Sequence, residues 1–480
     1  MKKVIPFLVI VVLLFAATIS SQAQILDNKG NDFYLTFLRN IPSAAPHVEL
    51  HLTSDVSTTV TVDYPINSPT FTTTVNVNPG AITIVSLPVN SSFGWTAGTV
   101  GNNGVHAYST DEFVCYMVNR LFSSSDAAMA IPVDALGTTY IAAGYYSDLV
   151  ATDRGQFAIV APNDSTSVTI TPSANLQGGY TAGVPFTILL NQGETFLAIS
   201  NTAGINGDIT GSIIEADKPV EVTNGNNCTT VPPGTPYCDH IFEVAQPVKT
   251  WGYRVPVVNL PNRGEGSVYR VLAQEDITSI TLDGSLVATL NRGEFYETAI
   301  MPGAHYFEGD KNIYVVQYMT SSTRPLTGGI GDPAMGNMIP IGQYLSSYTF
   351  STVGGQQFEK NYATILAENA DVNAGNILLD GVVIPAANFT PIAGTSYSYS
   401  VDSLSHGTHI SQSAGVHGLT VEGYNPDDSY LYPGGAGFEV PQADNMAPTC
   451  DLDAVNPGPP VSIDIRVQDM QSGIASIIVL

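Results

Sequence analysis

The sequence predicts an all-β fold: an array of about four related antiparallel, β-sandwich-like modules, followed by the start of an immunoglobulin-like module. Three observations lead to this prediction. Apolar and polar residues alternate along many short segments, helical spacing of apolar residues is almost absent, and a pattern of three short segments recurs four times. Alternation with a period of two places apolar side chains on one face of a strand, as in a half-buried sheet.

Alternating segments occur throughout the chain, for example VELHLTS, TTVTVDY, SVTITPS and NIYVVQY. Charged residues make up only 12% of the 480 residues, compared with roughly 25% in an ordinary soluble domain. Solubility must therefore depend on Ser, Thr, Asn and Gly, which suit exposed strand faces and turns better than helix surfaces. The composition thus agrees with the strand pattern.

The recurring pattern consists of a short strand, a Gly-containing turn with a second strand, and a longer closing segment. The short strand is TVTVD (59–63), SVTIT (167–171), SITLD (279–283) and NILLD (376–380). Taking Val62, Ile170, Leu282 and Leu379 as equivalent, the units are about a hundred residues long, enough for each to enclose a core. Within a β region from 24 to 440, we place the units at residues 31–122, 140–228, 251–322 and 345–432. Whether they close into a ring cannot be read from the sequence.

The amino terminus has the layout of a secretory signal peptide. Lys2 and Lys3 precede an apolar run that begins at Val4, and Ser21-Gln22-Ala23 supplies a small-residue exit. We expect cleavage after Ala23, so that residues 1–23 are removed. An uncleaved anchor is the alternative, because the apolar run is near the lower limit of roughly 17 residues for a spanning helix. The mature protein is then secreted or on the cell surface, and the compact Lys-Lys start points to a bacterial source.

The charge balance limits the partners. With 42 acidic and 16 basic residues the net charge is −26, which repels phosphate backbones and anionic lipid headgroups. We therefore expect no nucleic acid partner and no membrane insertion after removal of the signal. No cofactor is predicted, except that carboxylates leave calcium binding open; scattered negative charge otherwise forms a solvated exterior.

The four cysteines are too few for a disulfide scaffold. Cys228 and Cys238 flank the short segment TTVPPGTPY, and in an oxidising compartment we expect a disulfide between them, with free thiols as the alternative. Cys115 lies in the apolar segment FVCYMV and is expected to be a small buried residue.

Five residues are candidate ligand contacts. Trp251 and Tyr253 in TWGYR could form an aromatic platform for a sugar, although a Trp at the start of a strand also suits a core. The segment YNPDDSYLYPGGAG (424–437) contains Asp427, Asp428 and Tyr430. It could form a calcium or glycan site, or it could be a solvated turn that ends the fourth unit.

Catalytic motifs are not found in the sequence. It contains no Gly-x-Ser-x-Gly elbow, no His-Glu-x-x-His helix and no phosphate-binding Gly-x-x-x-x-Gly-Lys loop. His406 and His409 would lie on opposite faces of a strand, so they are not predicted to chelate a metal together. We predict no catalytic residues and no metal ligands. An extracellular hydrolase acting on polysaccharide stays an alternative, because paired carboxylates leave no spacing signal.

Several stretches of the second half of the chain match one family in a single order. They are CDHIFEVAQPVKTWGYRVPVV (238–258), YRVLAQEDITSITLDG (269–284), LNRGEFYE (290–297), GDPAMGNMIPIGQYLSSYTFST (331–352) and SYLYPGG (429–435). This pattern resembles the IgGFc-binding family, from about Asn31 to Pro441. The resemblance implies an extracellular, non-catalytic β region. The family's name comes from one animal member, so Fc binding is not carried over.

The carboxyl end differs in composition. Residues 441–460 read as a Pro- and Asp-rich linker, and 461–480 as the start of a truncated immunoglobulin-like module. We expect the chain to continue beyond Leu480. The sequence thus predicts a secreted or cell-surface binding or adhesion protein, with a glycan, mucin or protein ligand. A structural spacer within a larger multidomain surface protein is the alternative, beside the hydrolase.

Overall fold

The computed structural model describes residues 26–41, 46–89, 96–322, 330–354 and 358–439, together with the backbone of 449–456 and 462–468. Strands account for 54% of the chain and helices for 5%, which confirms the all-β prediction. The predicted signal peptide, residues 1–23, lies outside the described residues. Among the described residues, no helix is long and apolar enough to cross a bilayer.

Four modules each contain seven strands in the same order. Module 1 contains β1 (Gly30–Leu35), β2 (His47–Thr53), β3 (Thr58–Tyr64), β4 (Phe71–Val77), β5 (Thr83–Ser86), β7 (Val105–Leu121) and β8 (Ser124–Met129). Module 2 contains β9 (Gly137–Ile141), β10 (Gly155–Val160), β11 (Thr166–Thr171), β12 (Phe186–Leu190), β13 (Thr195–Ile199), β14 (Ile213–Thr229) and β15 (Asp239–Val244). The short β6 (Val100–Gly101) pairs with β13 of module 2.

Modules 3 and 4 repeat this order. Module 3 contains β16 (Gly252–Val258), β17 (Val268–Ala273), β18 (Thr278–Leu282), β19 (Ser285–Leu290), β20 (Phe295–Glu297), β21 (Ala304–Tyr318) and β22 (Met335–Met338). Module 4 contains β23 (Leu345–Ser351), β24 (Lys360–Glu368), β25 (Leu378–Leu379), β26 (Val382–Val383), β28 (Tyr397–Leu404), β29 (Thr408–Tyr424) and β30 (Ser429–Pro433), with the additional short β27 (Thr390–Pro391).

Helical segments are short and lie between strands. They are α1 (Asn369–Ala374) and the 3-10 turns η1 (Ile205–Gly207), η2 (Val248–Thr250), η3 (Ile341–Gln343) and η4 (Ala386–Asn388).

One long strand organises each module. In module 1 this strand is β7: its first half pairs with β1 and β3, and its second half pairs with β2 and β8. The fourth strand pairs with the third, and the fifth with the second. The sheet therefore folds about the long strand into two parts that face each other, a sandwich-like unit with its own core. β14, β21 and β29 occupy the same place in the other modules.

The segments of the sequence repeat coincide with equivalent strands. The four short TVTVD-like segments form β3, β11, β18 and β25, and the closing segments form β7, β14, β21 and β29. Burial along β11 alternates as predicted: Val168 and Ile170 are fully buried, whereas Thr169 between them is only half-buried. Unit boundaries differ from the prediction, because units ending at 122, 228 and 322 leave out the seventh strands β8, β15 and β22.

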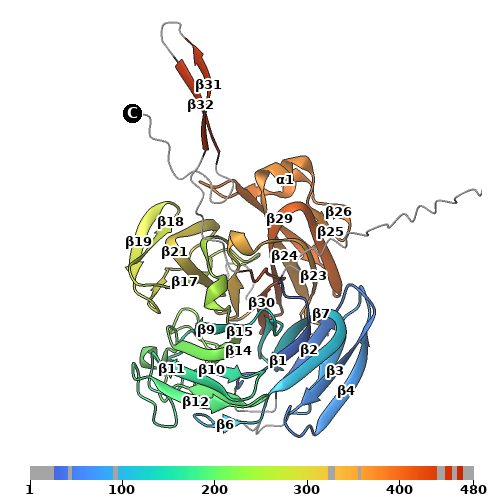
Figure 1. The fold of residues 1–480 in the computed structure, drawn as a ribbon, viewed down its shortest axis with the longest axis vertical. Coiled ribbons are helices and arrows are strands. Elements are labelled where there is room, and N and C mark those ends of the chain that lie inside the picture. The colour runs from blue at the N-terminus through green and yellow to red at the C-terminus, as the bar shows by residue number, and fades with distance from the viewer. Residues whose placement is uncertain are drawn as a thin grey trace, which may run out of the picture.

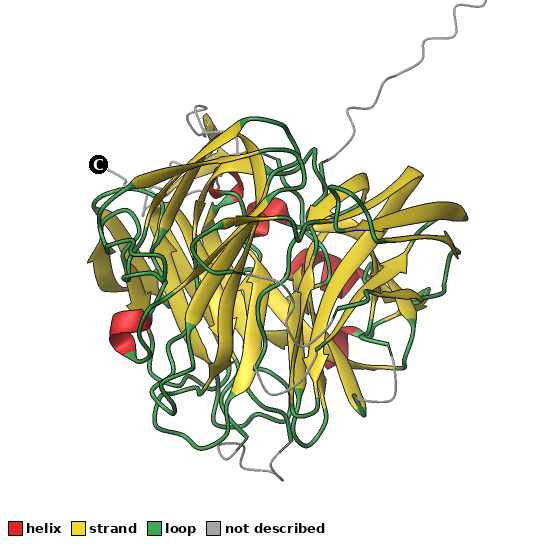
Figure 2. Cartoon of the chain, turned by 90° about the horizontal axis from the view of Figure 1, so that it is seen from below, coloured by secondary structure: helices red, strands yellow, loops and turns green. Residues whose placement is uncertain are grey.

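These seventh strands close the modules into a ring. β8 contacts β15, β15 contacts β22, β22 contacts β30, and β30 contacts β8. Figure 1 shows the four modules arranged around this common centre, with β15 and β30 near the middle, and Figure 2 shows the strands running between two sets of loops. The ends of the ring meet where Phe438 N donates to Leu26 O at 2.7 Å and Tyr116 Oη of module 1 donates to Gly434 O at 2.8 Å.

At the centre, the Asp126 carboxylate joins all four modules. Its Oδ2 accepts N–H bonds from Phe242 at 3.1 Å and Met335 at 3.2 Å. Its Oδ1 accepts from Ala127 at 2.8 Å and Leu431 at 3.4 Å. Each central strand is paired with a long strand on one edge only, so the N–H groups on its inner edge need other acceptors. One carboxylate on β8 thus satisfies a donor from each of the other three central strands.

Glu243 repeats this arrangement elsewhere along the central strands. Its Oε1 accepts from Met129 N at 3.3 Å and Val244 N at 3.1 Å, and its Oε2 accepts from Asn337 N at 3.5 Å. Burial raises the pKa of Asp126 and of Glu243 well above the usual range, whereas the N–H donors oppose the shift at both carboxyls. The centre of the ring is therefore polar and hydrogen-bonded rather than apolar.

The interface between modules 2 and 3 also contains a buried charge. The Arg270 guanidinium binds Asp208 and Glu297 at 2.8 Å each and lies over the Tyr145 ring, 4.3 Å from its centroid. It also donates to Gly144 O at 2.7 Å. Because Arg270 is buried with these partners satisfied, it fixes the two modules relative to each other.

The carboxyl end departs from the predicted linker. β31 (Thr449–Asn456) lies within residues 441–460 and pairs with β32 (Ser462–Gln468) in a two-stranded antiparallel sheet. The segment predicted as linker therefore contains a strand. Residues 469–480, the rest of the predicted immunoglobulin-like start, lie outside the described residues.

Replacing Asp126 with Asn should destabilise the ring. An amide has one acceptor oxygen, and its NH₂ group would face N–H donors, so buried donors would lose their acceptor at a cost of about 1–3 kcal/mol each. We expect a clearly lower thermal unfolding midpoint for Asp126→Asn. The exposed Asp134 provides the matched control, since Asp134→Asn should leave the midpoint unchanged. Equal midpoints for the two variants would contradict the central role of Asp126.

Glu422 should make stability depend on pH. Its side chain is buried on β29, accepts a bond from Thr364 Oγ1 at 2.8 Å, and has a pKa raised to about 8 by burial. Since the unfolded pKa is near 4.3, the folded state retains a proton that the unfolded state releases between these values. The contribution of protonated Glu422 to the free energy of unfolding is therefore complete at low pH and is lost as pH rises towards 8.

Glu422→Gln removes this dependence and retains an oxygen for Thr364. We expect the variant to match the native protein near pH 4.5 and to become progressively more stable than it towards pH 8, as measured by unfolding midpoints across this range. A difference that stays constant with pH would show that Glu422 does not titrate in this way.

Candidate functional site

Four hairpin loops lie at one end of the ring, because each central strand begins where its long strand ends. The loops connect β7 to β8, β14 to β15, β21 to β22 and β29 to β30. They comprise residues 122–123, 230–238, 319–334 and 425–428, of which 323–329 lie outside the described residues. We call this end of the ring the hairpin face.

The shortest loop exposes a large aromatic side chain. Leu121 pairs with Ser124 and closes a two-residue turn, and Phe122 within it is 96% exposed. Burying an exposed apolar side chain on binding contributes about 25 cal/mol for each Å² removed from water. Phe122 is therefore well placed to be an anchor for a partner.

A disulfide holds the loop of module 2. Cys228 and Cys238 are bonded, with Cα atoms 5.2 Å apart. Tyr237, next to Cys238, is 64% exposed. Gly234 N also donates to Asp148 Oδ1 at 3.1 Å, which connects this loop to the segment between β9 and β10. The loop thus presents Tyr237 from a covalently fixed base.

Three more exposed apolar side chains lie beside this loop. Leu149 and Val150 follow Asp148, and Ile205 of η1 is close to them because Gly204 N donates to Ser147 O at 2.7 Å. Single exposed apolar residues are normal on a protein surface, but a group of them marks an interaction site. The hairpin face of module 2 therefore carries such a group.

A groove of about 470 Å³ lies between modules 1 and 4 on the same face. It is lined by His47, Arg120, Leu121, Phe122, Ser123, Glu359, Asn425, Pro426, Asp427 and Asp428. The Arg120 guanidinium binds the Glu49 carboxylate at 2.8 Å, and together with His51 it lowers the pKa of Glu49 to about 2 against the opposing effect of burial. The groove combines apolar walls with fixed charges.

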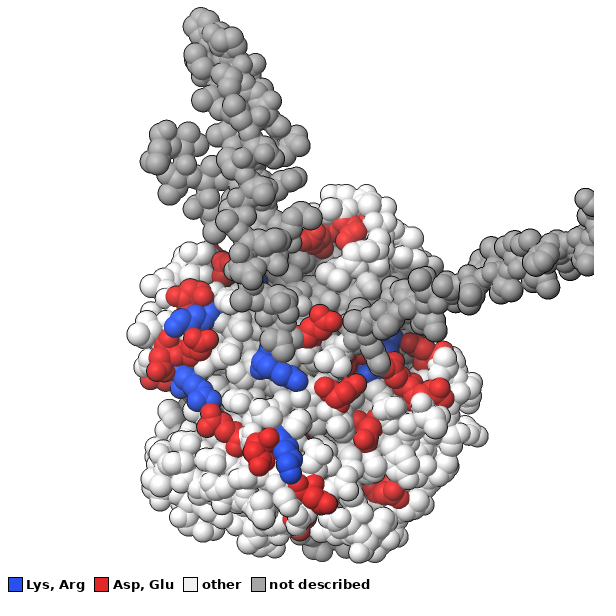
Figure 3. Space-filling model, in the orientation of Figure 1, with Lys and Arg blue, Asp and Glu red and all other residues white. Residues whose placement is uncertain are grey.

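Carboxylates from modules 2, 3 and 4 lie beneath the hairpin face. Asp239, Asp332 and Asp428 are all buried. Burial, and then the nearby charges of Asp428, Asp332 and Asp126, raise the pKa of Asp239 well above its usual range. Burial also raises the pKa of Asp332, to about 7, although its bond from Ser322 N and the Arg263 charge oppose this. These acids contrast with the surface ones, which Figure 3 shows scattered over the molecule.

The expectation that Trp251 contacts a ligand is wrong. Its side chain is fully buried, stacks on Tyr314 with ring centroids 5.0 Å apart, and donates Nε1–H to Gln246 O at 3.2 Å. An indole in the core at the boundary of modules 2 and 3 cannot reach a sugar. The neighbouring Tyr253 is 46% exposed, so an accessible aromatic surface remains there.

Tyr430 is likewise buried, and its expected ligand contact is wrong. Its hydroxyl donates to Asn361 Oδ1 at 2.7 Å within module 4. Of the two neighbouring acids, Asp427 is exposed in the groove, whereas Asp428 is buried. The turn between β29 and β30 therefore exposes Pro426 and Asp427, as the solvated-turn reading expected, whereas Asp428 is buried.

The described residues bring one set of three metal-type ligands within 4.8 Å of one another: Asp153, Cys228 and Cys238. Both sulfur atoms belong to the disulfide and cannot act as thiolates. This set therefore does not form a metal centre in the oxidised protein.

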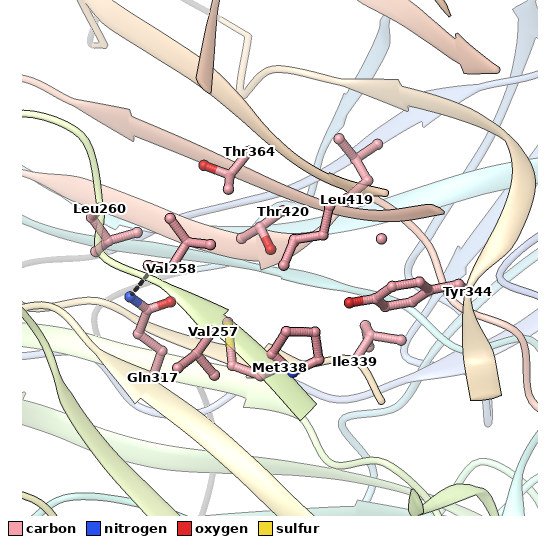
Figure 4. A pocket seen from close by; sticks show the side chains of 13 residues that line it. Val257, Val258, Leu260, Gln317, Met338, Ile339, Tyr344, Thr364, Leu419 and Thr420 are labelled. Carbon is pink, nitrogen blue, oxygen red and sulfur yellow. Dashed lines mark hydrogen bonds between the residues drawn. The ribbon is translucent and has the colours of Figure 1, made fainter. Parts of the chain in front are cut away.

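Two other hollows fit a ligand less well. A cavity of about 20 Å³ lies between modules 3 and 4 among Val257, Met338, Tyr344 and Leu419 (Figure 4), and that space suits no more than about one water. A groove of about 690 Å³ between modules 2 and 3 contains Lys249, Arg292 and Lys311, but each side chain has a protein partner. The three cations of this groove are therefore already paired, whereas the hairpin face exposes large apolar side chains.

Sequence reasoning missed the exposed residues of the hairpin face: Phe122, Leu149, Val150, Ile205 and Tyr237. One local signal existed for Phe122, since this large aromatic residue directly precedes the run Ser123-Ser124-Ser125, a composition typical of a turn. Leu149 and Ile205 carry no such signal, because their proximity depends on the packing of two separate loops.

Comparison with known proteins confirms the family resemblance seen in the sequence. A family model described as "IgGFc binding protein" matches residues 126–423. The match covers more than half of the chain, so the chain belongs to the IgGFc-binding protein family.

The chain is also 23% identical over 396 residues to the human protein named "IgGFc-binding protein". This alignment covers 78% of the chain and 7% of the human protein, so the chain spans only a small part of that relative. No solved structure matches the chain.

Removing the disulfide should loosen the hairpin face locally. For the Cys228→Ser, Cys238→Ser double variant we expect a stability loss of about 2–3 kcal/mol, from the entropy of a loop of this size, and faster proteolysis within residues 230–238. Unfolding midpoints and limited proteolysis measure both effects. A reductant should lower the unfolding midpoint of the native protein to that of the double variant and leave the midpoint of the variant unchanged. A reductant effect on the variant would show that the stability loss does not come from the Cys228–Cys238 disulfide.

Proposed function

We propose that this chain is a secreted, non-catalytic binding protein that recognises a protein ligand through the hairpin face. The observation that carries the proposal is the gathering of Phe122, Leu149, Val150 and Tyr237 on one face, around a loop held by a disulfide. A few aromatic and aliphatic anchors contribute most of the affinity of protein interfaces.

The rigidity of this face supports the same proposal. Its loops project from a closed ring that is joined at Asp126. The described parts of these loops are short, disulfide-bonded, or hydrogen-bonded to neighbouring loops. Anchors on a fixed scaffold lose little conformational entropy on binding, so more of the contact energy becomes affinity.

Charge favours protein over acidic glycan as the ligand. The net charge of −26 repels sulfated and sialylated sugars, whereas apolar anchors need an apolar patch that a protein surface supplies. Membership of the IgGFc-binding protein family agrees with a protein ligand, since the human relative is named for binding an antibody region. The protein part of a mucin is a ligand of the same class.

Binding measurements with two probes test the proposal. Immobilised human IgG Fc fragment and purified mucin are each exposed to the native chain and to two double variants. One double variant combines Phe122→Ser with Tyr237→Ser, and the other combines Leu149→Ser with Val150→Ser. For a probe that the native chain binds, each double variant should reduce affinity about tenfold or more, because each anchor contributes at least 1–2 kcal/mol.

The matched control replaces exposed apolar residues of the outer strands. Leu286 of β19 and Val382 of β26 are 65% and 69% exposed, and Leu286→Ser, Val382→Ser should leave binding unchanged. Equal losses in the control and the hairpin variants would place the contact elsewhere and contradict the proposal, as would full binding by the hairpin variants.

A further inference from the structure

A buried carboxyl group lies beside the disulfide of the hairpin face. One oxygen of Asp153 and the sulfur atoms of Cys228 and Cys238 all lie within 4.8 Å of one another. Asp153 and Cys228 are 3% and 2% exposed, whereas Cys238 is half-buried. The aspartate comes from the segment between β9 and β10, and the cysteines come from the end of β14 and from the residue before β15. Separate elements of module 2 thus bring three ligand-type side chains to one point.

Hydrogen bonds within its own segment fix the position of Asp153. Its Oδ2 accepts from Ser147 Oγ at 3.0 Å and from Val150 N at 3.3 Å, and its backbone N donates to Val150 O at 3.1 Å. The side-chain bonds described for this carboxyl group both go to Oδ2, so Oδ1 keeps its lone pairs for a further partner. Burial raises the pKa of Asp153, whereas the bonds from Ser147 and Val150 and the charge of Arg154 oppose the increase. The carboxyl group is therefore firmly placed and only partly compensated.

The backbone keeps the two cysteines close together independently of their S–S bond. Thr229 and Asp239, which directly follow them, are partners in the β14–β15 ladder. The loop between the cysteines is also anchored to module 3, because Val231 N donates to Ser321 Oγ at 3.1 Å and Ser321 N donates to Val231 O at 2.8 Å. Reduction of the disulfide therefore leaves two thiol groups side by side, next to the aspartate.

A thiol or a phosphine can reduce this disulfide from the solvent side, through the half-buried Cys238. In the thiol reaction the S–S bond breaks, both cysteines become thiols, and two reductant molecules give up two electrons and two protons to form a disulfide of their own. A metal ion that binds the pair then displaces both cysteine protons, because the thiolate is the form that ligates. Two thiolates and one carboxylate outweigh the single positive charge of Arg154.

We propose that the reduced chain binds one Zn²⁺ ion through Asp153, Cys228 and Cys238. Zinc takes four ligands in a tetrahedron, with Zn–S bonds of about 2.3 Å and Zn–O bonds of about 2.0–2.2 Å. Such bonds place neighbouring ligand atoms roughly 3.5–3.8 Å apart, so ligand atoms that already lie within 4.8 Å of one another need only small movements. Water completes the coordination on the solvent side of Cys238. Ca²⁺ and Mg²⁺ prefer oxygen ligands and do not suit a pair of thiolates.

The ion would replace the covalent link in the loop that presents Tyr237. In oxidising surroundings the S–S bond closes residues 230–238, and in reducing surroundings an S–Zn–S link closes the same loop. The hairpin face therefore keeps its shape in both redox states. This inference concerns the loop alone and holds whichever partner the hairpin face binds.

Titration with Co²⁺ tests the proposal on the full chain, because cobalt binds the same ligand types as zinc and its thiolate complexes absorb light. The chain is reduced with tris(2-carboxyethyl)phosphine, freed of metal with EDTA, and transferred to oxygen-free buffer that contains neither reagent. We expect a sulfur-to-cobalt charge-transfer band that saturates at one Co²⁺ per chain and disappears when ZnCl₂ is added. The oxidised chain should give no band. ZnCl₂ should also raise the thermal unfolding midpoint of the reduced chain.

A cysteine double variant identifies the sulfur ligands. The variant that combines Cys228→Ser with Cys238→Ser should show neither the band nor the zinc-dependent rise in the unfolding midpoint after the same treatment. A band that persists in this variant would come from Cys115 or Cys450 and would contradict the proposal. A reduced native chain without a band would contradict it as well.

Two substitutions in one segment test the carboxylate. Asp153→Asn keeps an acceptor for the bonds from Ser147 and Val150 but removes the charged ligand. Its Zn²⁺ affinity, measured by competition with a chromophoric chelator, should therefore fall about tenfold or more. The control Asp148→Asn replaces an exposed acid, keeps the bond from Gly234 N, and should retain the native affinity. Equal affinities in Asp153→Asn and the native chain would overturn the proposed three-ligand site.

Discussion

The closed ring depends on how the inner edges of its four central strands are satisfied. A strand at the edge of a sheet leaves N–H groups unpaired, and at the centre of this ring those groups are cut off from water. Asp126 accepts one N–H from each of the other three modules, and Glu243 accepts donors from three of the central strands. Carboxylates therefore do here what backbone carbonyls do inside a sheet.

This arrangement has two consequences for the surface. The central strands are held side by side, so the loops that lead into them emerge together as the hairpin face. The same strands carry buried aspartates at or just before their starts, so carboxyl groups gather beneath that face. A binding surface and a buried acidic cluster therefore lie at one end of the ring for the same topological reason.

The four modules share a topology but not their interfaces. Modules 2 and 3 are joined by the buried Arg270 with Asp208 and Glu297, beside a shared apolar cluster. Modules 1 and 4 instead share a larger apolar core. The hydrogen bond from Phe438 to Leu26 then closes the ring. A common strand order thus sets where the modules can meet, and the individual side chains decide how each pair is held.

Local signals in the sequence were sufficient for the strands and their order. Alternation identified β3, β11, β18 and β25, because a side-chain period of two follows from strand geometry alone. The short spacing and the predicted export of the chain pointed to the pair Cys228 and Cys238. Several motifs in one order identified the family.

The tertiary structure alone decided closure of the ring, the role of Asp126, the burial of Trp251 and Tyr430, and the exposure of Phe122 beside separate loops. These properties depend on contacts between modules far apart in the chain. A residue type states what a side chain can bond to, but only packing determines whether water or another module surrounds it.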